Sequence, residues 1–212
     1  YDGSSCRLHF SEFDTDIEAV VTVALGERLL WRIEVKNNTP YAVEWVDFLQ
    51  ITVPDDLVGQ GGKSRILWGF NEGVVIDDIA LREKFYGPRY IEPDYPSEGV
   101  MGIFPAIVQT QFMTYYDMTD GLYIGTHDNG GNVKGIDLYS HKDGIKLQFR
   151  LFSSAQRGED FAMDYDLVLA HFAGGWENGT EIYRRWFEEN RGGEFVKIPD
   201  NPKLPQWYAS SP

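Results

Sequence analysis

The sequence is short of cysteine and of basic residues, and both shortages exclude classes of protein. Cys6 is the single cysteine among 212 residues, so the chain has no internal disulfide, no cysteine-based zinc site and no haem-attachment motif. Lys and Arg together number 19 against 33 Asp and Glu, which gives a net charge of −14. A surface this acidic repels phosphate groups and argues against nucleic acid or anionic membranes as partners.

The sequence also lacks the common catalytic and membrane-spanning signatures. It has no Gly-rich phosphate loop, no G-x-S-x-G elbow and no H-E-x-x-H motif. No apolar run approaches the ~18 residues that cross a bilayer. Among the 33 acids, no spacing singles out the acid and nucleophile of a glycosidase. The chain starts at Tyr1 without a signal peptide, which indicates either a processed protein or a piece of a longer one.

Alternation of apolar and polar residues dominates the chain and predicts antiparallel strands. Within residues 30–37, Trp31, Ile33 and Val35 share one face. About nine or ten strands suit two packed antiparallel sheets, so we expect a mainly β, two-layer sandwich of the supersandwich type. The other main strands are expected at residues 17–25, 43–53, 65–70, 113–117, 122–127, 133–139, 145–152 and 163–172.

One segment near the end of the chain has helical periodicity instead. Four apolar residues recur at helical spacing between Ile182 and Phe187, and Gly192-Gly193 ends the pattern. The sequence predicts an amphipathic helix at about residues 176–190, closing a β-sandwich domain of residues 1–197. Residues 198–212 contain four prolines, which predicts an extended linker toward a further domain.

Several polar residues lie on the predicted strands, and each is expected either to have an ion-pair or hydrogen-bond partner or to face outward. Asp47 lies in phase with apolar neighbours, and Arg32 or Lys36 is the expected partner if the register allows it. His171 shares a face with two leucines and is expected to be a buried, hydrogen-bonded residue. On strand 145–152, the side chains expected to face outward are Lys146, Gln148 and Arg150.

The densest polar cluster is the Gly-rich turn of residues 127–132. Asp128 and Asn129 have side chains that suit sugar hydroxyls or Ca²⁺, and His127 is expected to face solvent. The spacing of a calcium-binding EF-hand loop is absent, so we expect no cofactor. Asn-Gly is also a common hairpin turn that needs no ligand. Aromatic residues, 15% of the chain, fit either sugar stacking or a wide sandwich core.

Several motifs, taken in order, resemble a known family. Together they resemble the amino-terminal galactose-mutarotase-like β-supersandwich of large bacterial glycoside hydrolases, such as relatives of endo-α-N-acetylgalactosaminidase. In that family a TIM barrel with the catalytic carboxylates follows the sandwich, so the resemblance assigns no catalytic residue here. The motifs are Leu29–Thr39, Tyr95-Pro96, Gln111–Asp117, Gly121–Asp128, Gly174–Trp176, Ile182–Trp186 and Leu204–Tyr208.

The resemblance implies a non-catalytic accessory module of a carbohydrate-active enzyme, with a downstream TIM-barrel domain and a carbohydrate as partners. Two alternatives stay open, because a fold alone fixes no function. One is a free-standing carbohydrate-binding protein, and the other is an aldose epimerase that uses His127 or His171. We expect glycan contact at His127, Asp128, Asn129 and Tyr95, and an exposed apolar domain interface at Trp176, Trp186, Trp207 and Tyr208.

Overall fold

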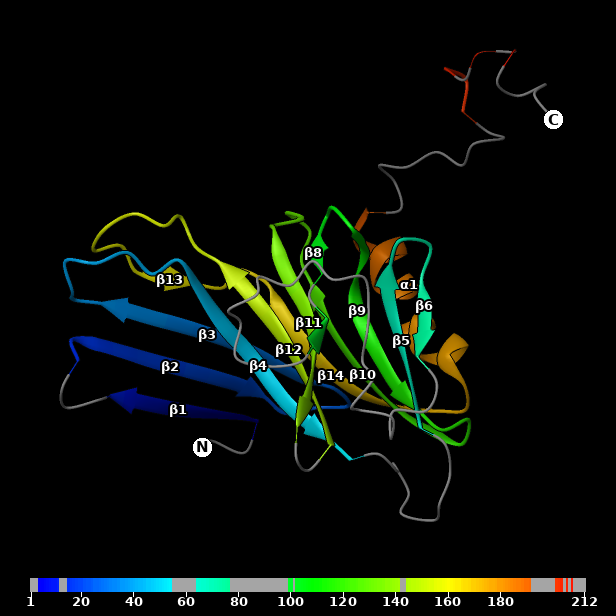
Figure 1. Ribbon diagram of the computed structural model, residues 1–212, viewed down its shortest axis with the longest axis horizontal. Helices are drawn as coiled ribbons and strands as arrows, with labels where there is room; N and C mark the ends of the chain where they lie inside the picture. The colour runs from blue at the N-terminus through cyan, green and yellow to red at the C-terminus, as the bar shows by residue number, and fades with distance from the viewer. Residues whose placement is uncertain are drawn as a thin grey trace.

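The chain folds into two antiparallel sheets that face each other, with one helix packed outside them (Figure 1). A computed structural model describes residues 4–11, 15–54, 64–76, 99–100, 102–141, 144–191, 201–203, 205 and 207. The mainly β, two-layer architecture expected from the sequence is confirmed, as is the single helix near the carboxyl end.

The larger sheet has nine strands in the order β1-β2-β3-β14-β10-β9-β5-β6, and β13 pairs with β3. Strands far apart in the sequence are neighbours in it, since β3 pairs with β14. Its strands are β1 (Ser5–Ser11), β2 (Ile17–Ala24), β3 (Leu29–Asn37), β5 (Arg65–Phe70), β6 (Val74–Ile76), β9 (Val108–Tyr116), β10 (Asp120–His127), β13 (Phe161–Ala162) and β14 (Asp166–Ala173).

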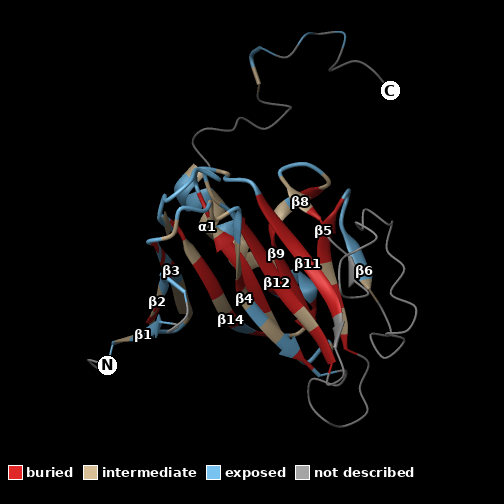
Figure 2. Ribbon diagram, turned by 60° about the vertical axis from the view of Figure 1, so that its left-hand side comes forward, coloured by how far each residue is buried: buried red, intermediate tan, exposed pale blue. Residues whose placement is uncertain are grey.

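The smaller sheet has five strands, with β4-β12-β11-β7 in order and β8 paired with β11. Its strands are β4 (Trp45–Val53), β7 (Gly99–Val100), β8 (Ile103–Phe104), β11 (Lys134–His141) and β12 (Gly144–Phe152). Buried residues concentrate on β9, β11 and β12, whereas β1 at the edge of the larger sheet is mostly exposed (Figure 2).

The burial of the strands follows the sequence periodicity on β3 and departs from it on β12. On β3, Ile33 and Val35 are buried while the intervening residues are exposed. On β12, Gln148 and Arg150 are buried, as is Phe149 between them. Both lie on the face opposite the apolar residues that enter the core, as expected, but they are buried there. Hydrogen bonds and ion pairs with neighbouring strands satisfy their polar groups.

Asp47 has a different partner from those expected. β4 lies in the smaller sheet beside β12, away from the strand that carries Arg32, and an irregularity in register brings Asp47 opposite Arg150. The carboxylate accepts a hydrogen bond from Gln148 at 2.9 Å and lies 3.6 Å from the guanidinium of Arg150. Arg32 instead pairs with Asp166 at 2.6 Å. Strand pairing, which local periodicity does not specify, decided these partners.

The helix α1 (Trp176–Arg191) covers the outer face of the larger sheet. The apolar residues of β9, β10 and β14 alternate between two clusters, one between the sheets and one beneath the helix. The cluster beneath the helix includes Phe112, Tyr123 and Phe172 of the sheet, and Ile182 and Tyr183 of α1 pack on it. No helix among the described residues is long and apolar enough to cross a membrane.

Gly179 sets how closely the helix approaches the sheet. It is the buried residue of α1, and an added Cβ would lie 2.6 Å from Cγ2 of Thr114 and 2.8 Å from the ring of Phe172. Both neighbours are themselves buried, so neither can move freely. The glycine therefore serves packing, at the expense of helix propensity.

Replacing Gly179 by alanine should lower the free energy of unfolding by about 1–3 kcal/mol, because the added methyl group overpacks the interface. Helix propensity alone predicts a gain of about 1 kcal/mol, so the sign separates the two effects. Urea denaturation measures it. Glu189→Ala, an exposed position on the same helix, is the matched control, and a stabilised Gly179→Ala would contradict the packing argument.

Candidate functional site

The polar turn after β10 is held by one buried carboxylate. Asp128 is 2% exposed, and its Oδ1 accepts a hydrogen bond from the backbone N–H of Gly130 at 2.8 Å. Its Oδ2 accepts from the backbone N–H of Asn132 at 2.6 Å. The Asp-containing turn is thus stabilised by its own side chain, as short polar side chains commonly do. Asp128 points inward and does not face an external sugar.

Asp128 also neutralises a buried lysine from the other sheet. The ammonium of Lys134, which is fully buried, lies 2.7 Å from Oδ2 of Asp128. It donates two further hydrogen bonds, to Oε1 of Gln111 at 2.9 Å and to the carbonyl of Asn132 at 2.7 Å. All three ammonium donors are therefore satisfied. Burial lowers the pKa of Lys134, and Asp128 opposes this shift.

Gln111 extends this network from the sheets to the helix. Its Oε1 accepts from Lys134, and its Nε2 donates to the carbonyl of Asp128 at 3.0 Å and to the Tyr183 hydroxyl at 3.5 Å. The residue is 3% exposed. One amide thus joins β11, β10 and α1, and this places the 127–132 turn at the meeting point of all three layers.

His127 is partly buried against the helix, which corrects the expectation that it faces solvent. Its ring stacks on Trp186 with centroids 4.7 Å apart, and its Nε2 lies 3.0 Å from the hydroxyl of Tyr123. Burial, together with the smaller effect of the nearby charge of Arg28, lowers the pKa of His127 to about 4. The neutral imidazole can accept a hydrogen bond from the Tyr123 hydroxyl. Together with the stacking on Trp186, this makes His127 a packing residue.

His171 lies in a different environment from the one expected. Its side chain is 70% exposed, and its Nε2 is 2.7 Å from Oδ1 of Asp120. It pairs with Leu122 in register, five residues along β10 from His127. Five strand residues span about 17 Å and an odd number reverses the face. The two histidines therefore cannot meet at one sugar ring.

The other residues that the sequence predicted for glycan contact or a domain interface differ in how far they are exposed. Asn129 is exposed on the turn. Trp176 is 38% exposed and Trp207 is 69% exposed, whereas Trp186 is half-buried by its stacking on His127. Tyr95 and Tyr208 lie outside the described residues. In the part of the chain that is described, no group of three or more His, Cys, Asp or Glu side chains is arranged to hold a metal ion.

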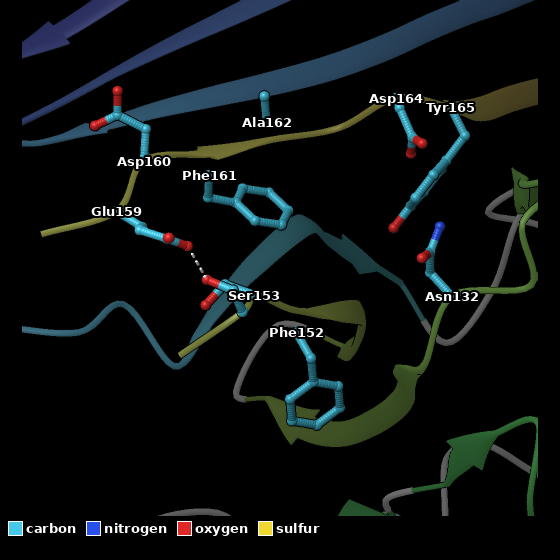
Figure 3. Close-up of a pocket in the computed structure, with 10 residues that line it drawn as sticks. Asn132, Phe152, Ser153, Glu159, Asp160, Phe161, Ala162, Asp164 and Tyr165 are labelled. Atoms are coloured by element: carbon cyan, nitrogen blue, oxygen red, sulfur yellow. Dashed lines mark hydrogen bonds between the residues drawn. The ribbon is translucent and has the colours of Figure 1, made fainter. Parts of the chain in front are cut away.

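A cavity of about 480 Å³ opens beside the turn, at a place the sequence did not single out. Tyr165 and Asp164, which precede β14, line it together with Asn132 (Figure 3). The alternation of residues 163–172 predicts a strand and gives no sign of a cavity. Tyr165 was the available signal, because an aromatic hydroxyl in phase with Leu167 places a polar atom on an apolar face.

Fold and site together define a two-sheet β-sandwich with a helix-covered outer face and a buried inter-sheet ion pair. No protein-family model matches the chain, and no curated protein matches it. Function therefore has to be argued from the residues themselves.

Removing either member of the buried ion pair should lower the free energy of unfolding. Asp128→Ala leaves the ammonium of Lys134 without a counter-charge, and Lys134→Met leaves the carboxylate, so each should lower the free energy of unfolding by about 3–5 kcal/mol. The double variant should lose less than the sum of the two. Chemical denaturation measures all three.

The control for the ion-pair variants is an exposed pair on the helix. Arg184 lies 2.7 Å from Glu181, and Arg184→Ala should leave stability nearly unchanged because solvent screens exposed pairs. Strictly additive losses at Asp128 and Lys134 would show that the two charges do not stabilise each other.

Acidification should destabilise the protein through His127. In the unfolded chain this histidine titrates near its ordinary pKa of about 6.5, and in the folded chain near about 4. Between these values the unfolded state binds more protons, so stability present above pH 6.5 should fall by up to about 1.4 kcal/mol per pH unit as pH drops toward 4.

His127→Phe should flatten this part of the curve, because a phenyl ring keeps the stacking without titrating. His9→Gln, which replaces an exposed histidine, should not change the slope. Denaturant unfolding at half-unit pH steps measures the difference between each variant and the parent. An unchanged slope in His127→Phe would rule out burial of a neutral imidazole at this position.

Proposed function

We propose that the chain is a non-catalytic accessory β-sandwich of a carbohydrate-active enzyme, packing against a downstream TIM barrel and contacting glycan. The motifs that resemble such modules lie in order along β3, β9, β10 and α1. The acidic surface suits a neutral ligand better than a phosphorylated one. The proposal also accounts for a helix followed by a proline-rich segment.

The observation that carries the proposal is the exposure of large aromatic side chains at and beyond the helix. Trp176 begins α1 and is 38% exposed, and Trp207 in the following segment is 69% exposed. Exposed indole rings are favourable anchors for a neighbouring domain, because tryptophan contributes strongly when it becomes buried at an interface. The interface is therefore proposed at these two residues, with Trp186 and Tyr208 as the other candidates.

The arrangement of the histidines favours a binding or accessory role over an epimerase. A sugar-ring epimerase needs its acid and base within reach of one ring. His127 is neutral and stacked on Trp186, while His171 projects from the opposite face about 17 Å away. The carboxylate of Asp128 is held by Lys134. The residues first considered for proton transfer therefore have structural partners.

Hydroxyl-radical footprinting tests the proposed interface. We expect the reading frame to continue beyond Pro212 into a barrel domain. In that longer polypeptide, oxidation of Trp176 and Trp207 should slow by at least about fivefold relative to the 212-residue chain, because the rings become buried. Trp45, on β4 and 39% exposed, is a control of similar exposure and should react equally in both.

Two results would overturn the proposal. Equal oxidation of all three tryptophans in both polypeptides would remove the interface. Polarimetric mutarotation of galactose or glucose by the purified 212-residue chain, lost on His127→Ala or His171→Ala, would show an epimerase. A frame that ends at Pro212 would favour the alternative of a free-standing carbohydrate-binding protein, for which the cavity beside β14 is the specific supporting observation.

A further inference from the structure

The cavity of about 480 Å³ lies where the end of β12 in the smaller sheet faces β13 and the start of β14 in the larger one (Figure 3). This volume falls within the range of small-molecule sites and has room for one or two sugar rings. Its walls combine aromatic rings with polar side chains. The lining residues are Asn132, Phe152, Ser153, Ser154, Glu159, Asp160, Phe161, Ala162, Asp164 and Tyr165.

Tyr165 supplies an unused polar group inside the cavity. The residue is nine-tenths buried, with 9% exposure, and its hydroxyl points into the cavity toward Asn132 (Figure 3). Within the described ranges this hydroxyl has no hydrogen-bond partner. Burial raises the pKa of Tyr165, so the hydroxyl stays protonated and available as a donor. The hydroxyl is reachable from the cavity, so a bound ligand can accept the hydrogen bond that water otherwise accepts.

The other polar groups are mainly hydrogen-bond acceptors. Asp160 is held by Lys36 at 2.7 Å and by the backbone N–H of Asn37 at 2.8 Å. Glu159 accepts from the Ser154 hydroxyl at 2.6 Å. Because a carboxylate has about four lone-pair sites, both can accept further hydrogen bonds. Asp164 has no ion-pair partner among the residues described.

This charge pattern selects against anions and favours donor-rich ligands. None of the described lining residues is cationic. Phosphate or carboxylate ligands therefore meet Glu159 and Asp164, which have no cationic partner among the described residues, beside Asp160, which Lys36 compensates. A ligand bearing several hydroxyl groups can donate to those carboxylates and accept from Tyr165. The rings of Phe152 and Phe161 offer apolar surfaces for the C–H faces of a sugar.

The position of Lys134 favours a neutral ligand over a cationic one in the cavity. Its ammonium lies 4.9 Å from the centroid of the Tyr165 ring, so a cation already occupies the π-system of that tyrosine. A second cation on the same ring would be repelled by the first. Asp160 is also neutralised already by Lys36. A neutral polyol avoids this repulsion, while an organic ammonium ion does not.

We propose that this cavity is a binding subsite for one or two neutral sugar residues, with Tyr165 as hydrogen-bond donor and the carboxylates of Asp164 and Glu159 as acceptors. The inference rests on the proposed function for its glycan and deepens it by locating the contact. It moves the contact from the side chains of the 127–129 turn to the cavity that Asn132 borders.

NMR titration of the 212-residue chain with lactose, maltose and cellobiose tests the subsite. At least one disaccharide should bind with a dissociation constant at or below about 5 mM. Tyr165→Phe keeps the ring and its contact with Lys134 but removes the donor, so it should weaken binding about three- to tenfold. Ala162→Trp at the rim should abolish binding by filling the cavity.

The controls locate the effect and identify the ligand chemistry. Tyr41→Phe removes an exposed hydroxyl at a different hollow of the surface and should leave binding unchanged. Tetramethylammonium chloride and inorganic phosphate should not bind at 10 times the disaccharide dissociation constant. Amide spectra of each variant report folding, and Ala162→Trp keeps the test valid if Tyr165→Phe fails to fold.

Each other outcome overturns the inference. Disaccharide binding that both cavity variants leave intact would place the glycan contact elsewhere while leaving the accessory role untouched. Binding of tetramethylammonium without any disaccharide would make the cavity a cation site. Absence of binding by all the probes would remove the subsite, and the tryptophan footprint would still decide the accessory role independently.

Discussion

The buried ammonium of Lys134 is the constraint on which the arrangement of layers depends. A lysine in the interior is tolerated only when a counter-charge and acceptors surround it. Here the smaller sheet contributes the lysine, and the larger sheet and its following turn contribute Asp128 and Gln111. Gln111 reaches in turn to Tyr183 of the helix. Satisfying one charge therefore fixes β11, β10 and α1 relative to one another.

The larger sheet differs from a half-exposed sheet because both of its faces are covered at β9, β10 and β14. Alternate residues enter the inter-sheet core or the helical interface. At its edge β1 remains largely exposed. The double burial explains why His127, which follows an apolar strand in the sequence, lies in an aromatic cluster with Tyr123 and Trp186. A histidine in such surroundings is neutral near pH 7, and with a pKa of about 4 it is a weak base.

Polar side chains at the rim between the sheets differ in whether they have internal partners. Around the turn, each acceptor of Asp128 has an internal donor. A short distance along the chain, Tyr165 and Asp164 face an open cavity without such partners among the described residues. Ligand binding is thus proposed where polar side chains lack hydrogen-bond partners within the described residues. Contact with another domain is proposed where tryptophan rings are exposed. The two proposed roles involve different residues of the sandwich.

Local periodicity was enough to predict much of this fold. The alternation of Trp31, Ile33 and Val35 gave β3, and the helical spacing near Tyr183 gave an element that begins at Trp176 and ends one residue beyond the predicted end. These features depend on neighbours in the chain, so a single sequence contains them. The fate of the polar residues depends instead on which strands become neighbours. The pairing of β4 with β12 places Asp47 opposite Arg150. The packing of β11 in one sheet against β10 in the other brings Lys134 within 2.7 Å of Asp128. Burial and charge compensation arise from contacts between distant segments, which only the tertiary structure brings together.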